Sequence, residues 1–194
     1  MEKKGVRLRW SCTVERIVRT DGGSLLVTLG TGETLEVDQV LMATGRRPNT
    51  SGLGLDAVGV ETNERGAIVV DDTFTTSVPS IVALGDVIDR VQLTPVALGE
   101  GMVVAHRLFG DGGRSIDYRD IPTAVFTHPN VATVGLTEAE ARKTHERVRV
   151  FKSRFRPMKH TMSGRDERCF MKLVVCGTSD RVLGCHMVLS LIHI

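Results

Sequence analysis

Hydrophobic and polar residues alternate with a period of two through the first part of the chain. The alternation covers three segments, 7–18, 24–29 and 33–37, and glycine-rich turns at 21–23 and 30–32 separate them. Alternation of this period between tight glycine turns is typical of neighbouring half-buried strands. This part of the chain therefore predicts an antiparallel meander of three strands.

Two later segments are apolar almost without interruption. The first covers residues 39–44, and the second covers residues 81–84, after a stretch at 71–78 that is predicted to be extended. Continuous apolar runs of this length are typical of strands buried on both faces in the centre of an α/β sheet. Glycine residues interrupt any period from 45 to 63, so a loop is expected there.

The most regular helical pattern begins at Thr94, which is expected to be the N-cap, with Pro95 at the first helical position. Gly110 is suited to end the helix. Apolar residues recur with helical spacing and are expected to form its buried stripe: Leu98, Met102, Ala105 and Phe109.

A glycine-rich polar segment at 110–115 has the composition of a linker, and the pattern changes after it. The second part predicts a strand at 124–126, a helix from a capping box at 137–140 to about residue 145, and strands at 148–155, 168–176 and 181–188. Residues 177–180 are predicted to turn the last two strands into a hairpin. The fold class expected is thus α/β followed by α+β, the latter with an antiparallel sheet.

The composition is that of an ordinary globular protein, since 41% of the 194 residues are hydrophobic and 25% are charged. Lys and Arg number 25 against 23 Asp and Glu, and a net charge of +2 argues against dedicated binding of nucleic acid or membrane surfaces. No apolar run reaches the roughly 20 residues of a membrane helix, and the first residues form no apolar signal core. We therefore expect a cytoplasmic protein.

Four cysteines, Cys12, Cys169, Cys176 and Cys185, have neither Cys-x-x-Cys spacing nor a histidine pair at zinc-ligand spacing beside them, so no metal site is expected. A redox pair between Cys169 and Cys176 is excluded because both fall on one predicted strand, where seven residues span roughly 20 Å or more. The four are expected to be partly buried strand residues in a reducing compartment.

Two predicted strand ends carry candidate ligand-binding residues. Gly85 and Asp86 follow the strand at 81–84, and Gly45 follows the strand at 39–44. Ligands of α/β sheets bind beyond the carboxyl ends of strands, where glycine permits close approach and a carboxylate accepts hydrogen bonds from hydroxyl groups. A turn aspartate that caps a helix is the structural alternative for Asp86. Together, the two glycine endings favour a dinucleotide-type enzyme.

Several motifs, in this order and spacing, resemble the flavin-dependent pyridine-nucleotide disulfide reductases, at 43–50, 83–87 and 93–97. Residues 121–129 and 134–138 resemble the start of that family's dimerisation domain. Within the family, the segment from 155 to 175 is most similar to the glutathione reductases of bacteria and plants.

The resemblance implies three regions. Residues 1–48 would be the tail of the NAD(P)-binding domain, and residues 49–118 the second segment of the FAD-binding domain, so that both belong to a Rossmann-like region. Residues 119–194 would form part of the dimerisation domain. Within that last region, residues 189–194 depart from the family's pattern and are expected to be a tail foreign to it.

The resemblance also assigns cofactor residues. Asp86, after Gly85, would hold the ribitol of FAD, and Thr94 would meet the flavin ring at a helix N-terminus, whose dipole favours the negative charge of reduced flavin.

On the nicotinamide side, the resemblance implies roles for Gly45, Gln92 and Ala124 toward NADPH. It implies that Met158 reaches glutathione bound at the other subunit of a homodimer. Met102 stands where many glutathione reductases have an arginine for the substrate, which leaves other disulfides open.

The activity implied is hydride transfer from NADPH to FAD and electron transfer through a cysteine pair to glutathione disulfide, in the service of thiol redox balance. The family's first flavin motif, its Cys-x-x-x-x-Cys pair, its NADP loop and its proton-transfer histidine have no match in the chain, so no catalytic residue is assigned and the chain alone is expected to be inactive. The alternatives are a reductase of the dihydrolipoamide dehydrogenase or mercuric reductase type, and a non-catalytic dimerisation fragment.

Overall fold

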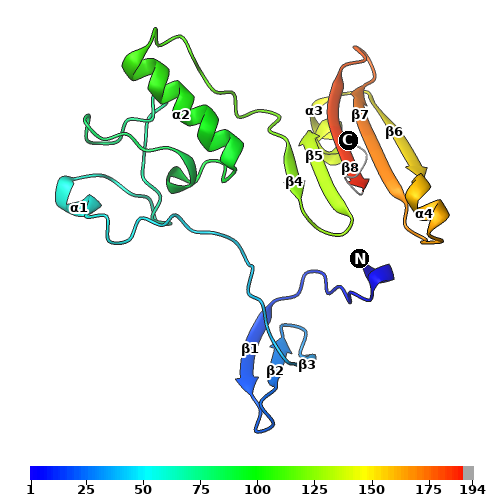
Figure 1. Ribbon diagram of the computed structural model, residues 1–194. Coiled ribbons are helices and arrows are strands. Elements are labelled where there is room, and N and C mark those ends of the chain that lie inside the picture. Colours follow the sequence, from blue (N-terminus) through cyan, green and yellow to red (C-terminus); the bar gives the residue numbers. More distant parts are fainter. Residues whose placement is uncertain (190–194) are drawn as a thin grey trace. The chain divides into compact units, whose positions relative to one another are not determined.

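A computed structural model describes residues 1–189 (Figure 1). The prediction of a foreign tail at 189–194 therefore lies, apart from Leu189, outside the described residues. The chain divides into two compact units, one made of residues 1–36 with the segment from 118 onward, and the other of residues 37–117. Each unit is described by itself below.

The first unit begins with a 3-10 turn, η1 (Glu2–Lys4), and continues into a small sheet. This sheet is formed by β1 (Val14–Arg19), β2 (Leu25–Leu29) and β3 (Thr34–Val37), in the order β1-β2-β3. The predicted three-strand meander is confirmed, although its first strand begins at Val14 rather than at residue 7. Only β2, the central strand, has fully buried side chains, at alternate positions, whereas all six residues of β1 are exposed.

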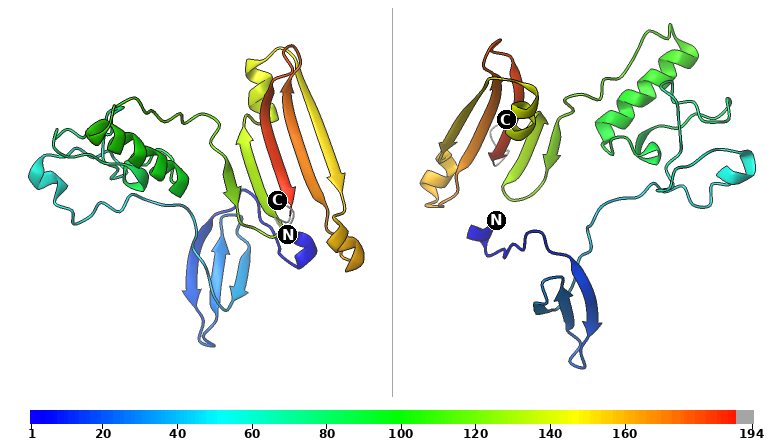
Figure 2. Two further views of the ribbon diagram at one scale, coloured as in Figure 1. Left: turned by 45° about the horizontal axis from the view of Figure 1, so that its top comes forward. Right: turned by 180° about the vertical axis from the view of Figure 1, so that it is seen from behind.

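The same unit contains a five-stranded antiparallel sheet, with strand order β4-β5-β8-β7-β6. Figure 2 shows its long strands side by side and helix α3 on one of its faces. Its elements are β4 (Thr123–Val125), β5 (Asn130–Gly135), α3 (Glu138–Thr144), β6 (Val148–Phe155), α4 (Met158–Met162), β7 (Cys169–Cys176) and β8 (Val182–Leu189).

Most of the predicted elements of this sheet are confirmed to within a residue or so at each end, including the β7–β8 hairpin. The pattern missed β5 and the single-turn helix α4. All the residues of β5 are partly buried, so they lack the alternation of exposed and buried positions that reveals a strand. Cys169 and Cys176 stand at opposite ends of β7 and are both free, as expected.

Helix α3 begins where the capping box predicts. The Thr137 backbone N–H donates to Glu140 Oε2 at 2.8 Å, and the Glu140 N–H donates to Thr137 Oγ1 at 3.3 Å. At the same end of the helix, Glu138 Oε2 lies 2.8 Å from Lys172 Nζ of β7. Lys172 and Arg142 lower the pKa of Glu138 from an ordinary 4.5 to about 2. The first turn of α3 is thereby linked to the middle of the sheet.

The second unit packs around α2 (Thr94–Phe109), with the short turns α1 (Leu55–Val58) and η2 (Gly85–Ile88). Loop residues and α2 share one core, made of Val60, Ile68, Phe74, Ala83, Ile88, Val103 and Val104. Apart from α1, the segment 45–63 is irregular as predicted.

Two strands that the sequence predicted in this unit are absent from the structure, so these predictions were wrong. Residues 39–44 form no strand, and Leu41 is 89% exposed. A strand buried on both faces needs a hydrogen-bonded neighbour on each edge, and no described strand pairs with this segment. Residues 81–84 have only an isolated bridge, Thr75 to Val82.

The stretch at 71–78, predicted to be extended, contains a tight turn. Phe74 is 1% exposed and has a left-handed backbone (φ +64°). Asp71 Oδ1 stabilises the turn by accepting from the N–H groups of Thr73 and Thr75, at 2.8 and 2.9 Å. A short-range side-chain turn of this kind competes with extended structure.

Helix α2 differs from its prediction in two respects. Its N-cap is Leu93, and Thr94 is already helical. The expected apolar stripe is exposed, since Leu98 is 67% and Phe109 is 89% accessible. The helix is apolar on more than one side, and the side that packs on the core is Val96, Glu100, Val103 and Val104.

Candidate functional site

The candidate cofactor residues Gly85 and Asp86 lie in the short turn η2, directly against the first turns of α2. Gly85 has a left-handed backbone (φ +74°), and a Cβ built on it would lie 3.2 Å from Ala97 Cβ. Both facts favour glycine, because other residues are strained at this φ and the space toward the helix is already filled.

The backbone N–H of Gly85 points toward the interior of the unit. It donates to Glu100 Oε2 at 2.6 Å, and the Glu100 side chain is 1% exposed. Because Ala97 and Glu100 are three residues apart, they lie on the same side of α2 and both meet this turn. The sequence analysis did not identify Glu100. Its position among Val96, Val103 and Val104, at helical spacing, could have shown that it is buried.

Asp86, in contrast, keeps its carboxylate accessible, with half of the side chain exposed. Its Oδ2 lies 3.4 Å from Nη1 of Arg46, whose side chain is 72% exposed. Exposed ion pairs of this kind contribute little to stability, so the carboxylate is free to exchange partners. This ion pair brings Gly45 (φ +123°), which follows the first of the two apolar segments, next to Gly85 and Asp86, which follow the second. The two sites are far apart in the sequence.

Gln92 is held by a second carboxylate just beyond η2. Asp89, at a left-handed φ of +53°, accepts from Gln92 Nε2 at 2.7 Å through Oδ1, and its Oδ2 lies 3.1 Å from Arg65 Nη1. The Asp89 side chain is only 12% exposed. Neither Asp89 nor Arg65 was a predicted site residue, and for Arg65, within an irregular segment, no pattern pointed to it.

Thr94 is the exposed first residue of α2, two residues after Gln92. The positive end of the helix dipole lies here, and the helix is 16 residues long. Gly85, Asp86, Gln92 and Thr94, with Gly45 through its neighbour Arg46, thus belong to one compact unit.

The two remaining predicted residues belong to the other unit. Ala124 is an exposed residue of β4, and Met158 is the first residue of α4, with 76% of its side chain accessible. The side chains are therefore accessible to a ligand at both positions.

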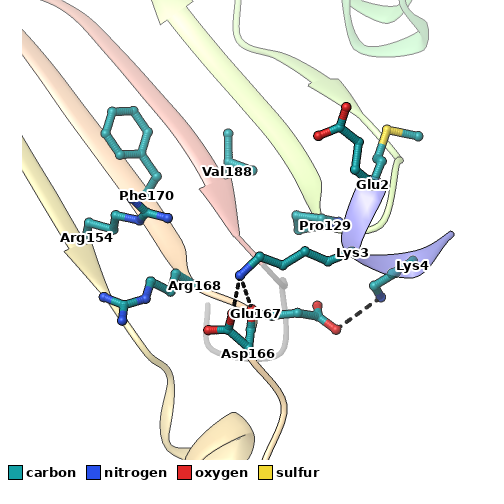
Figure 3. A pocket seen from close by; sticks show the side chains of 11 residues that line it. Glu2, Lys3, Lys4, Pro129, Arg154, Asp166, Glu167, Arg168, Phe170 and Val188 are labelled. Atoms are coloured by element: carbon teal, nitrogen blue, oxygen red, sulfur yellow. Dashed lines mark hydrogen bonds and ion pairs between the residues drawn. The ribbon is translucent and has the colours of Figure 1, made fainter. Parts of the chain in front are cut away.

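A cavity of about 440 Å³ in this unit lies between η1 and the end of the large sheet (Figure 3). Lys3 is paired with Asp166 and Lys4 with Glu167 at its rim, and Phe170 forms part of its wall. None of the predicted site residues lines it.

The cysteines offer one chemically distinct thiol. Hydrogen bonds from Ser179 and Thr178, in the turn after β7, lower the pKa of Cys176 from 9.0 to about 7. Within residues 1–189 no three His, Cys, Asp or Glu side chains are grouped as a metal site, and no helix is long and apolar enough to cross a membrane.

Comparison with known families decides the class of protein. A family described as pyridine nucleotide-disulphide oxidoreductase matches residues 1–101, and the dimerisation domain of that family matches residues 121–190. The chain belongs to the pyridine nucleotide-disulphide oxidoreductases. The match confirms the expected fold class, a flavin- and nucleotide-binding region followed by a dimerisation domain with an antiparallel sheet. Members of this family, including the glutathione reductases, use FAD and NADPH.

Individual relatives of this oxidoreductase chain point in the same direction. The chain is 47% identical over 188 residues to the glutathione reductase of Burkholderia cepacia. The aligned region covers 97% of the chain and 42% of that enzyme. The chain is 40% identical over 185 residues to the trypanothione reductase of Trypanosoma congolense, covering 95% of the chain and 38% of that enzyme.

Among solved structures, the flavoprotein disulfide reductase RclA of Escherichia coli superposes with a TM-score of 0.82 at 32% identity. The superposition covers 92% of this oxidoreductase chain and 41% of RclA. The chain therefore spans less than half the length of the relatives that it matches.

Proposed function

We propose that the chain is part of an NADPH- and FAD-dependent reductase that acts on glutathione disulfide as a homodimer and maintains thiol redox balance. The observation that carries the proposal is the Gly85–Asp86 turn, which leaves one carboxylate accessible at the start of a long helix, within a chain 47% identical to a glutathione reductase.

The residues of this turn fit FAD. Asp86 presents an accessible carboxylate that can accept two hydrogen bonds from ribitol hydroxyls, once its weak pair with Arg46 opens. Gly85 keeps the backbone close to α2, and Thr94 lies where the helix dipole favours the charge of a reduced flavin. Bound FAD would accept hydride from NADPH and pass electrons on to a cysteine pair.

We propose that Gly45, Gln92 and Ala124 lie on the side that binds the nicotinamide of NADPH, and that Met158 contacts glutathione. Gln92 is already oriented by Asp89, which leaves its carbonyl oxygen as the group available to a ligand. The proposed regions are 1–48 for the end of the NAD(P)-binding domain, 49–118 for the second FAD segment and 119–194 for the dimerisation domain. The four free cysteines support a reducing, cytoplasmic compartment.

A second candidate substrate follows from the trypanothione reductase among the relatives, which is 40% identical. If the substrate is a disulfide, the choice between the two depends on residues that contact the group beyond the sulfur atoms. Met102 and the accessible Met158 are such positions in this chain.

The test is a graft in which the chain replaces the matching segment of the Burkholderia cepacia enzyme. We expect the purified graft to retain FAD and to oxidise NADPH with glutathione disulfide in preference to trypanothione disulfide or lipoamide. A graft rebuilt from the Burkholderia segment through the same junctions is the control. A colourless graft beside a yellow control contradicts the flavin assignment, and a preference for another disulfide contradicts the substrate.

A further inference from the structure

Glu100 is a buried acid that the residues proposed to touch the cofactor do not include. It is 1% exposed in the middle of α2, and its helical neighbours toward the core are Val96, Val103 and Val104. An isolated carboxylate among such side chains is strongly unfavourable unless hydrogen bonds compensate its lost hydration. A leucine would fill a site of this kind without that penalty, so a role beyond packing is indicated.

A hydrogen bond that Glu100 accepts from Gly85 points to that role. Its Oε2 lies 2.6 Å from the backbone nitrogen of Gly85, the residue that directly precedes Asp86. A bond from a peptide N–H to a buried carboxylate is among the stronger hydrogen bonds in proteins. It fixes the peptide plane that leads into Asp86.

A second contact restrains the same residue from the other side. Ala97, one turn before Glu100, fills the space into which a Gly85 side chain would project, at 3.2 Å from the Cβ position. The left-handed backbone of Gly85 is thus enclosed by α2 on its Cα side and anchored by Glu100 at its N–H. The Asp86 side chain, one peptide further, is less restrained, because its carboxylate is half exposed and its ion pair with Arg46 is weak.

We propose that Glu100 is a positioning residue, whose buried carboxylate holds the Gly85–Asp86 turn on α2 so that the Asp86 carboxylate meets the ribitol hydroxyls of FAD. The inference rests on the proposed function of Asp86. It adds that part of the affinity for FAD is determined by an acid that does not touch the cofactor.

The experiment measures the dissociation constant of FAD in the graft, by fluorescence at a temperature well below unfolding. Glu100→Leu removes the acceptor and is expected to weaken FAD binding about tenfold or more. Glu100→Gln keeps an acceptor oxygen with a weaker, neutral hydrogen bond, and is expected to restore most of the affinity.

Val103→Ala is the matched control. It removes buried atoms from the same face of the same helix, one turn from Glu100, and leaves the hydrogen bond from Gly85 to Glu100 in place. It is expected to lower the melting temperature while FAD binds as in the parent. The inference is overturned if Val103→Ala and Glu100→Leu lower the melting temperature equally and also weaken FAD binding equally. Glu100 would then act only through the general stability of the fold.

A double variant decides whether Glu100 acts through Asp86. If it does, Asp86→Ala with Glu100→Leu binds FAD no more weakly than Asp86→Ala alone. Independent, additive losses overturn the positioning role. If Asp86→Ala weakens binding and neither Glu100 variant does, the inference fails and the proposed function stands, whereas unchanged binding in Asp86→Ala contradicts both.

Discussion

Asp86 is the residue on which the flavin assignment depends. In the graft, Asp86→Ala removes charge-assisted hydrogen bonds that contribute about 1.5–3 kcal/mol. We expect FAD binding to weaken roughly tenfold to a hundredfold, since about 1.4 kcal/mol corresponds to one decade. FAD retention on purification and a fluorescence titration measure the change.

The matched control for this substitution is Asp72→Ala, an exposed aspartate of the same unit in the turn before Phe74. It should leave FAD affinity unchanged. If Asp86 serves only as a turn residue, Asp86→Ala lowers the melting temperature while the protein remains fully yellow, and the assignment is wrong.

A pair of glycines tests why η2 lies against α2. Gly85→Ala places a methyl group 3.2 Å from Ala97 and forces an L-residue to φ +74°, so we expect a loss of about 1–2 kcal/mol in the free energy of unfolding. Gly101→Ala, within α2, meets no atom within 4 Å and should stabilise by about 0.5–1 kcal/mol. Urea unfolding measures both, and equal changes of the same sign would contradict this account of the turn.

At the scale of elements, the link between α3 and the large sheet depends on an ionised carboxylate. The pKa of Glu138 falls from 4.5 to about 2 in the folded protein, chiefly through Lys172 and then Arg142. Because the folded-state pKa is the lower one, its stabilising effect is complete above about pH 4.5 and is lost as the pH falls toward 2. The chain should therefore lose stability across this acid range.

Glu138→Gln removes this dependence, so its stability should fall less steeply between pH 4.5 and 2 than that of the parent chain. Urea midpoints measured at several pH values across that range provide the comparison. Glu146→Gln, at an exposed glutamate just after α3, is the control and should follow the parent curve. Parallel curves for all three proteins would show that the Glu138 bridge does not link helix and sheet.

At the scale of the whole molecule, several large apolar side chains of the described residues are exposed to solvent. Leu41 and Phe109 are each 89% exposed, and Leu98 is 67% exposed. Apolar patches of this kind and unpaired extended segments favour association with other chains. We expect the isolated chain to elute as broad, concentration-dependent oligomers and to bind a hydrophobic dye.

Replacing Leu98 and Phe109 by serine should shift the elution toward smaller species, because both lie on the exposed side of α2. Glu100 and the buried valines on the other side of the helix are unchanged in this variant, which serves to separate surface effects from loss of fold. A sharp monomeric peak with a cooperative melting transition for the parent chain would contradict the expectation.

Local chemistry in the sequence was sufficient for most of the elements after residue 118, though not for β5 and α4. The capping box at Thr137 satisfies backbone donors within a single turn, and the hairpin between β7 and β8 needs only a short turn and two alternating strands. The β1–β2–β3 meander followed from the same short-range rules. The sequence also predicted a close approach of the backbone at Gly85, because glycine has no Cβ, and in the structure this approach is to Ala97 of α2.

Only the tertiary structure decided which apolar face of α2 is buried and what the buried face contains. A helix with apolar residues on two sides satisfies the same periodicity in either orientation, and the core around Phe74 selects Val96, Glu100, Val103 and Val104. The contacts of Glu100 with Gly85 and of Arg46 with Asp86 join residues 15 and 40 positions apart. The segment at 39–44 shows the converse: its apolar pattern is that of a central strand, but a strand forms only where a neighbour supplies the other half of each hydrogen bond.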